Sequence, residues 1–247
     1  MPVIGFLGVG HIAADLIAGL LCAGRRPETL LLSPRGRETA QALHRAHGIP
    51  IATDNAALVA ASDIVMLCVR PKAAVAAGIP RSALATAAAP AEIVRAMPVS
   101  AARFGASPTT LHPDETRAHA LLAQFGPVLP VADEVVFERA TLGAAMYGWV
   151  FALIGESTAW LEGAGLDPAQ ARALAAGTFA AAAAFIAGDD RPVPDLLAAL
   201  ATPGGITEAG LDRLRKAGAL PAWHAAFDSA LARVTMLGQP LSRPDCV

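Results

Sequence analysis

A glycine turn directly after the first apolar segment constrains the fold more than any other feature of the sequence. The segment VIGFL at residues 3–7 is followed by six residues in a G-x-G-x-x-A pattern, Gly8-Val9-Gly10-His11-Ile12-Ala13. A strand, a tight glycine turn and a helix in this order form the dinucleotide-binding fingerprint, in which the helix N-terminus binds a pyrophosphate. We therefore predict a cofactor site at Gly8, Val9, Gly10, His11 and Ile12; the alternative is a glycine turn that binds no ligand.

The first 70 residues alternate between short apolar segments and helical patterns. Three segments have the length and composition of strands, VIGFL, TLLL and DIVMLCV, with helices expected between them at about residues 12–22 and 38–46. This alternation predicts βαβ units and a parallel sheet. From residue 137 onward the apolar residues follow helical spacing alone. The expected fold class is therefore α/β, with a Rossmann-type parallel-sheet domain at residues 1–133 followed by an all-helical dimerisation domain at residues 134–247.

The composition excludes several classes of partner. The formal net charge is −2 and the Lys and Arg residues are scattered, so neither nucleic acid nor an anionic membrane surface is an expected partner. The longest uncharged windows, residues 140–155 and 173–188, fall short of the ~20 residues that cross a bilayer. Helices this apolar instead predict burial in a homodimer or a higher homo-oligomer. The N-terminus lacks the basic segment of a secretory signal, so we expect a cytoplasmic protein.

The sequence predicts no metal site. Its three cysteines are far apart and odd in number, so they define neither a disulfide framework nor a C-x-x-C zinc site. His44 and His47 can share a helical face, but no carboxylate accompanies them, and a solvated surface is the better interpretation.

The end of the second expected strand decides between the two nicotinamide dinucleotides. NAD-binding proteins carry an Asp or Glu at this point, which bonds the ribose 2′-hydroxyl. Here the sequence is LLLSPRGR, which has Ser33, Arg35 and Arg37 in place of a carboxylate. A hydroxyl and guanidinium groups suit a 2′-phosphate, so we predict NADP(H) bound by Ser33 and Arg35. Arg37 is either a further ligand or part of a solvated basic turn.

Two further segments belong to the expected cofactor site. Val69, Arg70 and Pro71 close the segment DIVMLCV, and the carboxyl ends of parallel strands form the ligand crevice. Asn55 precedes an alanine-rich helical turn, where an adenosine contact and a helix N-cap are equally consistent with the sequence. All four residues are predicted to bind the cofactor.

Residues 201–210, ATPGGITEAG, interrupt an otherwise helical half of the chain. Each of the adjacent glycines Gly204 and Gly205 disfavours a helix interior by ~1 kcal/mol relative to alanine, and Pro203 cannot continue a helix. A break of this kind between two threonines indicates a site in which backbone groups are exposed.

Motifs spread over most of the chain resemble pyrroline-5-carboxylate reductase. They are IGFLGVGHIA, DIVMLCVRP, AAGI, VRAMP, FG and, most specific of all, TPGGITEAGLDRL. The resemblance implies an NADP-type Rossmann domain, a helical dimerisation domain and an active site where the cofactor domain of one subunit meets the helices of the dimer. The implied reaction transfers hydride from the nicotinamide to the imine carbon of pyrroline-5-carboxylate, which gives proline.

The same resemblance assigns roles to the break at residues 201–210. It implies that Thr207 lies near the imine nitrogen and that Thr202 hydrogen-bonds the substrate, which makes both catalytic and substrate-binding residues. The backbone N–H groups of Gly204 and Gly205 are expected to bind the carboxylate of the imino acid. The structural alternative is that Thr207 caps the next helix while the glycines only make the turn.

Two segments lose polar groups that the family carries at the active site. Val99-Ser100-Ala101 replaces an Asn-Thr-Pro run after Met-Pro, and residues 143–149, GAAMYGW, replace a Ser-Gly-Ser-Gly-Pro-Ala-Tyr type motif. Tyr147, in the second segment, is either an alternative proton donor or a packing residue.

A third departure concerns the sheet. Only residues 72–75 separate the end of DIVMLCVRP from AAGI, whereas a parallel crossover needs at least ~10 residues. We therefore expect a sheet that lacks a strand or that continues through a strand EIVRA at residues 92–96.

These observations lead to three functional hypotheses. The first is an NADPH-dependent reductase of pyrroline-5-carboxylate or a related cyclic imino acid, a small-molecule substrate. The second is a catalytically degenerate, NADP-binding dimeric homologue with a regulatory role. The third, a β-hydroxyacid dehydrogenase, is the weakest, because Lys216 is the only lysine of the second domain.

Overall fold

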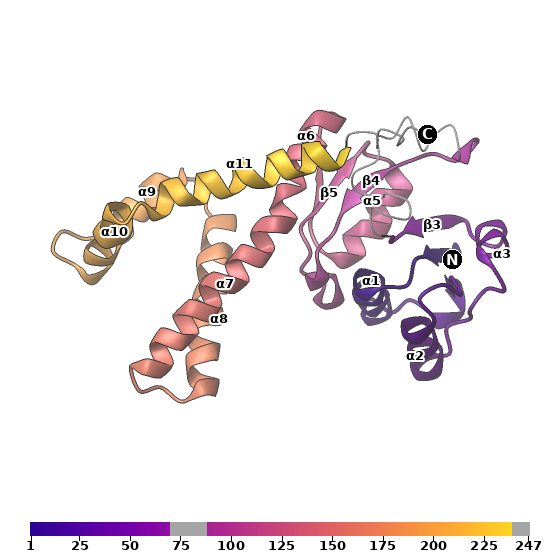
Figure 1. Ribbon diagram of the computed structural model, residues 1–247, viewed down its shortest axis with the longest axis horizontal. Coiled ribbons are helices and arrows are strands. Elements are labelled where there is room, and N and C mark those ends of the chain that lie inside the picture. Colours follow the sequence, from indigo (N-terminus) through magenta and orange to yellow (C-terminus); the bar gives the residue numbers. More distant parts are fainter. Residues whose placement is uncertain (70–87, 239–247) are drawn as a thin grey trace, which may run out of the picture. The chain divides into compact units, whose positions relative to one another are not determined.

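The computed structural model describes residues 1–69 and 88–238, which fold into two units (Figure 1). One unit comprises Met1–Ala144 together with the end of the chain from Arg233, and the other comprises Ala145–Ala232. The predicted residues Arg70 and Pro71 and the short connection at 72–75 lie outside the described residues. The domain boundary expected after residue 133 stays a prediction.

A parallel three-stranded sheet begins the first unit (Figure 1). Its strand order is β2-β1-β3, and Ile4 of β1 pairs with Leu30 of β2 and Ile64 of β3. The elements are β1 (Ile4–Leu7), α1 (His11–Cys22), β2 (Leu30–Leu32), α2 (Arg37–His47), α3 (Asn55–Ala60) and β3 (Ile64–Leu67). The strands and helices alternate as the sequence predicts, and the Rossmann-like start of the chain is confirmed.

Helix α1 packs on this sheet through one buried face. Its residues Leu16, Ile17 and Leu20 are 1% exposed or less. They share one core with Ile4 and Phe6 of β1, which are fully buried. Full burial of each such side chain stabilises the fold by ~1.5–3 kcal/mol relative to exposure. This core fixes the position of the glycine turn between β1 and α1.

A second three-stranded sheet belongs to the same unit, with strand order β4-β5-β6. Strand β4 is antiparallel to β5, and β5 is parallel to β6. The elements are β4 (Arg95–Met97), η2 (Ser100–Phe104), β5 (Thr109–His112), α5 (Thr116–Leu122), η3 (Ala123–Phe125) and β6 (Val128–Pro130). The strand expected at residues 92–96 thus starts at Arg95. Strands β5 and β6, of four and three residues, are too short to show a pattern and were not predicted.

The described residues from Glu134 to Gly238 are mainly helical, as the sequence predicts. Its elements are α6 (Glu134–Ala140), α7 (Leu142–Gly163), α8 (Pro168–Ala187), α9 (Val193–Leu200), α10 (Ile206–Lys216) and α11 (Ala219–Gly238). Within the second unit, the ring of Trp149 on α7 meets the rings of Phe227 and Trp223 on α11 edge-on, with centroids 4.9 and 5.7 Å apart. These edge-to-face contacts join α7 to α11.

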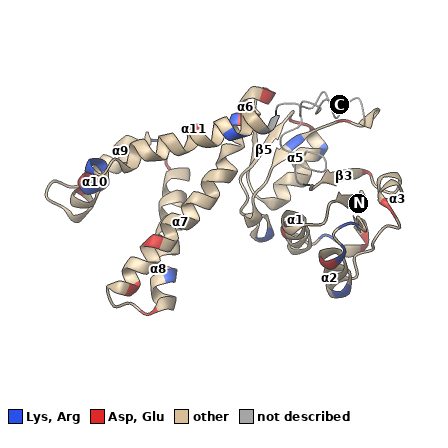
Figure 2. Ribbon diagram, in the orientation of Figure 1, with Lys and Arg blue, Asp and Glu red and all other residues tan. Residues whose placement is uncertain are grey.

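The helices of the second unit expose large apolar side chains. Figure 2 shows α7, α8, α9 and α11 with few charged residues, and Trp160, Phe151 and Phe185 are 72%, 58% and 53% exposed. Helix α8 buries only Ala171 and Ala175. Within the described part of the chain, α8 is the one helix that is long and apolar enough to span a membrane, by length and composition alone. Helices in the core of soluble proteins meet the same criteria.

Candidate active site and cofactor site

The turn between β1 and α1 has the geometry that a pyrophosphate requires. Gly8 has φ +94°, a conformation that side chains rarely adopt, and Val9 follows it into the core. Gly10 is the N-cap of α1, and none of the described atoms lies within 4 Å of where its Cβ would be. No side chain caps the helix, so the N–H groups of its first residues, His11 and Ile12, are left without an acceptor among the described residues. This glycine turn and the uncapped N-terminus of α1, called here the phosphate cradle, fit a phosphate group.

The carboxyl end of β3 packs against the same turn. A Cβ on Gly8 would lie 2.9 Å from the carbonyl oxygen of Cys68 and 2.5 Å from Cγ1 of Val69. This contact places Val69 where the sequence predicts it, beside the fingerprint. Desolvation raises the pKa of the Cys68 thiol to about 12, so this side chain is neutral at physiological pH.

The segment after β2 also approaches the fingerprint turn. Gly36, the N-cap of α2, has φ +85°, and a Cβ here would lie 2.7 Å from the carbonyl oxygen of Val9. Arg35 and Arg37 flank Gly36 and are exposed, and no side chain caps α2. The N-terminus of α2 and the two arginines therefore lie beside the phosphate cradle. Their chemistry fits a ribose 2′-phosphate.

Ser33 and Asn55 join the end of β2 to the start of α3. Ser33 is fully buried, its hydroxyl donates to Oδ1 of Asn55 at 2.7 Å, and it accepts from the backbone N–H of Arg35 at 3.2 Å. Asp54 is the N-cap of α3 and accepts from the N–H of Ala57 at 2.8 Å. The N-cap interpretation of Asn55 is therefore wrong, because Asp54 has that role. The structure places Ser33 so that it orients Arg35 and Asn55.

The break at residues 201–210 forms a loop between α9 and α10. Gly205 is the N-cap of α10, so Thr207 is the second residue of the helix and the interpretation of Thr207 as the cap is wrong. The N–H of Gly205 donates to the carbonyl oxygen of Thr202 at 2.9 Å. The N–H of Gly204 donates to Oε2 of Glu208 at 2.7 Å. Both N–H groups expected to bind substrate are thus engaged within the chain, and the substrate-binding role of these residues stays a prediction.

Glu208, the third residue of α10, binds this loop, and the sequence did not identify it as a site residue. A signal for it exists, because Gly205 and Glu208 have the N-cap and N3 spacing at which a glutamate side chain reaches back over the helix start. In the described part of the chain, the N–H groups of Ile206 and Thr207 have no acceptor, as expected in the first turn of a helix.

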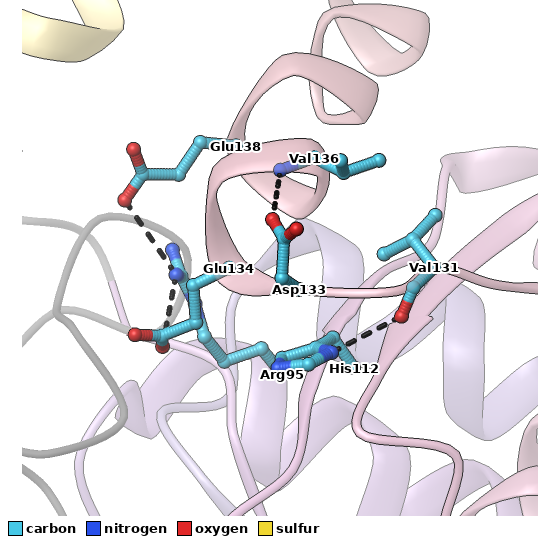
Figure 3. Close-up of polar contacts among 7 residues, drawn as sticks. All are labelled: Arg95, His112, Val131, Asp133, Glu134, Val136 and Glu138. Carbon is cyan, nitrogen blue, oxygen red and sulfur yellow. Dashed lines mark hydrogen bonds and ion pairs between the residues drawn. The ribbon is translucent and has the colours of Figure 1, made fainter.

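A buried arginine ties β4 to α6 within the first unit (Figure 3). Nη1 of Arg95 lies 3.3 Å from Oε1 of Glu134 and 3.6 Å from Oε1 of Glu138. Its guanidinium group also lies over the ring of Phe137, 4.6 Å from the centroid. The Arg95 side chain is 1% exposed, while both carboxylates are partly solvated. Because β4 ends at Met97, Arg95 fixes the strand that leads into Val99-Ser100-Ala101, where the family carries polar active-site residues.

Comparison with known proteins places this geometry in a family. Residues 139–237 match the model for pyrroline-5-carboxylate reductase dimerisation, and residues 3–94 match the model NADP oxidoreductase coenzyme F420-dependent. The chain belongs to the pyrroline-5-carboxylate reductase family. It is an NADP-dependent oxidoreductase with an NADP-binding Rossmann-like domain followed by a helical dimerisation domain, as the sequence predicts.

The relatives match over the full length of the chain. Pyrroline-5-carboxylate reductase of Corynebacterium melassecola is 26% identical over 97% of this chain and 100% of its own, and that of Pseudomonas aeruginosa is 27% identical over 98% and 99%. Among solved structures, pyrroline-5-carboxylate reductase of Coxiella burnetii superposes with a TM-score of 0.81 at 21% identity, covering 97% of this chain and 99% of that one. The Plasmodium falciparum enzyme with NADP bound gives 0.85 at 18% identity, covering 96% and 98%. These structures support the fold.

In this member of the pyrroline-5-carboxylate reductase family, one substituted segment forms the N-cap and start of η2 and the other lies within α7. Val99 is 6% exposed, and its N–H donates to the hydroxyl of Ser107 at 2.9 Å. Residues 143–149 lie within α7, which starts at Leu142. The ring of Tyr147 lies 4.7 Å from that of Phe151, a packing contact that leaves both interpretations of Tyr147 open.

The histidines form no metal site with other groups of the described chain. In that part, no three His, Cys, Asp or Glu side chains are grouped to hold a metal ion. Nδ1 of His44 lies 2.8 Å from the carbonyl oxygen of Ile49.

Proposed function

We propose that this chain uses NADPH to reduce pyrroline-5-carboxylate, or a closely related cyclic imino acid, to the corresponding amino acid. Full-length relatives from several organisms bear the name pyrroline-5-carboxylate reductase. The observation that carries the proposal is the loop at residues 202–207. There the N–H of Gly204 bonds the carboxylate of Glu208 at 2.7 Å, a bond that the carboxylate of an imino acid takes over once it displaces Glu208.

On the cofactor side, NADPH supplies the hydride when bound. The N-terminus of α1 at Gly10 holds the pyrophosphate, because its N–H groups are uncapped and the space around it is open. Arg35 holds the 2′-phosphate at the N-terminus of α2, and Ser33 and Asn55 keep this segment in place through their 2.7 Å hydrogen bond. Val69, Arg70 and Pro71 complete the predicted cofactor site.

On the substrate side, the loop hydroxyls act on the imine nitrogen. An imine accepts hydride far more readily when it is protonated, so a hydroxyl that orients or relays a proton to nitrogen favours the reaction. We assign this role to Thr207, with Thr202 as a further hydrogen-bonding partner. A threonine hydroxyl is a weak acid, so water is the ultimate proton source. Hydride adds to the imine carbon and the proton to nitrogen, which gives the secondary amine and NADP⁺.

The second unit makes the protein a homodimer in this proposal. The dimerisation family model covers residues 139–237. An open groove between α7 and α8, about 530 Å³ in volume, is lined mainly by apolar residues that include Trp160, Leu174 and Phe179, together with the polar residues Glu156, Ser157 and Thr178. Trp160 and Leu174 are 72% and 52% exposed in the single chain, and a second copy would remove them from water. Burial of α8 between subunits, rather than in a membrane, fits the cytoplasmic location that we propose.

Steady-state rates of NADPH oxidation with synthetic pyrroline-5-carboxylate and other cyclic imines test the proposal. We expect turnover with the imino acid, and we expect Thr207→Val to reduce kcat by ~10²-fold without changing the Kd of NADPH. Thr158→Val is a matched control, because that hydroxyl bonds the carbonyl oxygen of Ile154 in its own helix.

Two outcomes would contradict the proposal in different ways. Tight NADPH binding without turnover of any imine would overturn the reductase and favour a catalytically degenerate, regulatory homologue. Unchanged turnover in Thr207→Val would remove Thr207 from the mechanism.

A further inference from the structure

The carboxylate of Glu208 occupies a backbone donor of the loop where the substrate carboxylate is proposed to bind. Its Oε2 accepts from the N–H of Gly204 at 2.7 Å, the distance of a charge-assisted hydrogen bond. Glu208 is the third residue of α10, and its side chain reaches back across the helix start to the residue before the N-cap. A single N–H cannot serve two carboxylates, so a carboxylated substrate must displace Glu208 from Gly204.

The neighbouring donors do not remove this conflict. The N–H of Gly205 is engaged by the carbonyl oxygen of Thr202 at 2.9 Å. The N–H groups of Ile206 and Thr207 are available among the described residues, but Glu208 lies in the same helical turn. A substrate carboxylate that binds there meets the negative charge of Glu208 at short range, and like charges so placed repel each other.

Glu208 also lacks a compensating cation in the described part of the chain. The ion pairs of α10 lie one turn further on, where Nη1 of Arg215 is 3.4 Å from Oδ1 of Asp212. Among the described residues, the Glu208 carboxylate is therefore balanced only by the Gly204 N–H and by the positive end of the α10 dipole. The Glu208 carboxylate therefore leaves a net negative charge next to Gly204.

We propose that Glu208 is a specificity-determining residue that lowers the preference of this enzyme for carboxylated cyclic imines over carboxylate-free ones. The inference rests on the proposed function, because it assumes that the imine binds at residues 202–207. When the substrate is an imino acid, Glu208 competes with it for Gly204. When the imine carries no carboxylate, Glu208 keeps its hydrogen bond and its charge stabilises the protonated iminium. Glu208 thus favours imines without a carboxylate and disfavours those that carry one.

The test compares two imines that differ only by the carboxylate, pyrroline-5-carboxylate and 1-pyrroline. In Glu208→Gln we expect the ratio of kcat/KM for pyrroline-5-carboxylate to that for 1-pyrroline to rise about tenfold, mainly through a lower KM for the acid; this corresponds to ~1.4 kcal/mol. Asp212→Asn is the control, because it removes the same charge from the same helix one turn away. The ratio should change less than twofold in that variant.

The outcomes separate the inference from the function that it rests on. A purely structural role for Glu208 would change kcat/KM for both imines alike, so an unchanged ratio with both imines turned over would overturn the inference alone. Turnover of neither imine by the wild type would overturn the proposed function and the inference together. Glu208→Asp gives a second comparison should the glutamine variant fail to fold. It keeps the charge but shortens the reach to Gly204, and a ratio equal to that of the wild type would contradict the competition.

Discussion

The two glycines of the fingerprint should respond in opposite ways to the same substitution. Gly8 has φ +94°, and a Cβ on it would meet the backbone oxygen of Cys68 at 2.9 Å and Cγ1 of Val69 at 2.5 Å. Gly10 has φ −104°, and a Cβ on it would meet none of the described atoms within 4 Å. Gly8→Ala therefore perturbs the fold, whereas Gly10→Ala places a methyl group in the space reserved for the cofactor.

The expected change in the free energy of unfolding follows from these contacts. A left-handed conformation costs an L-residue ~1–2 kcal/mol, and overlap with packed atoms that cannot rotate away costs a further ~1–3 kcal/mol. The lower entropy of the unfolded alanine chain offsets ~0.4–1 kcal/mol of this. We expect Gly8→Ala to lower the free energy of unfolding by about 3 kcal/mol, which shifts Tm by roughly 6–12 °C in a chain of this size. Gly10→Ala should leave Tm within ~2 °C of the wild type and weaken NADPH binding at least tenfold.

Thermal stability and NADPH affinity, measured on both variants, test these two expectations. Thermal unfolding should be followed by far-UV circular dichroism, because all three tryptophans, Trp149, Trp160 and Trp223, lie in the second unit and do not report on the first. NADPH binding is measured by titration of its fluorescence. Wild-type NADPH affinity in Gly10→Ala would refute the placement of the pyrophosphate at the N-terminus of α1, and wild-type stability in Gly8→Ala would refute the steric argument.

Two further predictions concern cofactor choice and the end of β3. Arg35→Ala should raise the Kd of NADPH about tenfold or more while hardly changing that of NADH, whereas Arg45→Ala, which removes the same charge from α2, should change neither; equal effects of Arg35→Ala on both dinucleotides would contradict the 2′-phosphate site. Desolvation raises the pKa of the Cys68 thiol to about 12, so the thiol stays protonated in the folded state. The contribution of this thiol to the free energy of unfolding is therefore fully present below the ordinary thiol pKa and is lost as pH rises toward 12. Peptide mass mapping after alkylation at pH 8 should therefore find the exposed Cys22 modified and Cys68 protected until the protein unfolds. Rapid alkylation of Cys68 in the native protein would contradict the desolvated environment assigned to this thiol.

The first sheet could be predicted because its signals are local and agree with one another. The segments VIGFL, TLLL and DIVMLCV became β1, β2 and β3, and the glycine turn lies where the fingerprint requires it. Strands β1 and β2 are each followed by a helix, α1 and α2, and α3 precedes β3, so pattern and topology point to the same fold. The helical half was predictable for the same reason.

The second sheet and the polar contacts of the site could not be predicted in the same way. Strands β5 and β6 are stabilised by their pairing in the sheet, which is a long-range property, and their three or four residues show no period. The interpretation of Asn55 as a helix cap failed because Asp54, one residue earlier, already satisfies the N–H of Ala57.

The polar contacts of side chains that reach across a turn could not be predicted from the sequence either. The carboxylate of Glu208 engages Gly204, whose N–H was expected to bind the carboxylate of the substrate. The pairing of Arg95 with Glu134 and Glu138 joins residues about 40 positions apart, and only a cation inside an apolar strand hints at it.

Transfer of a labelled hydride tests the central claim most directly. The enzyme is incubated with NADPH carrying deuterium at the transferable position of the nicotinamide and with unlabelled pyrroline-5-carboxylate, and the product is analysed by mass spectrometry. We predict proline that is one mass unit heavier, with the deuterium on the former imine carbon, formed in a 1:1 ratio with NADP⁺. The absence of labelled proline, with NADPH still bound, would contradict the account.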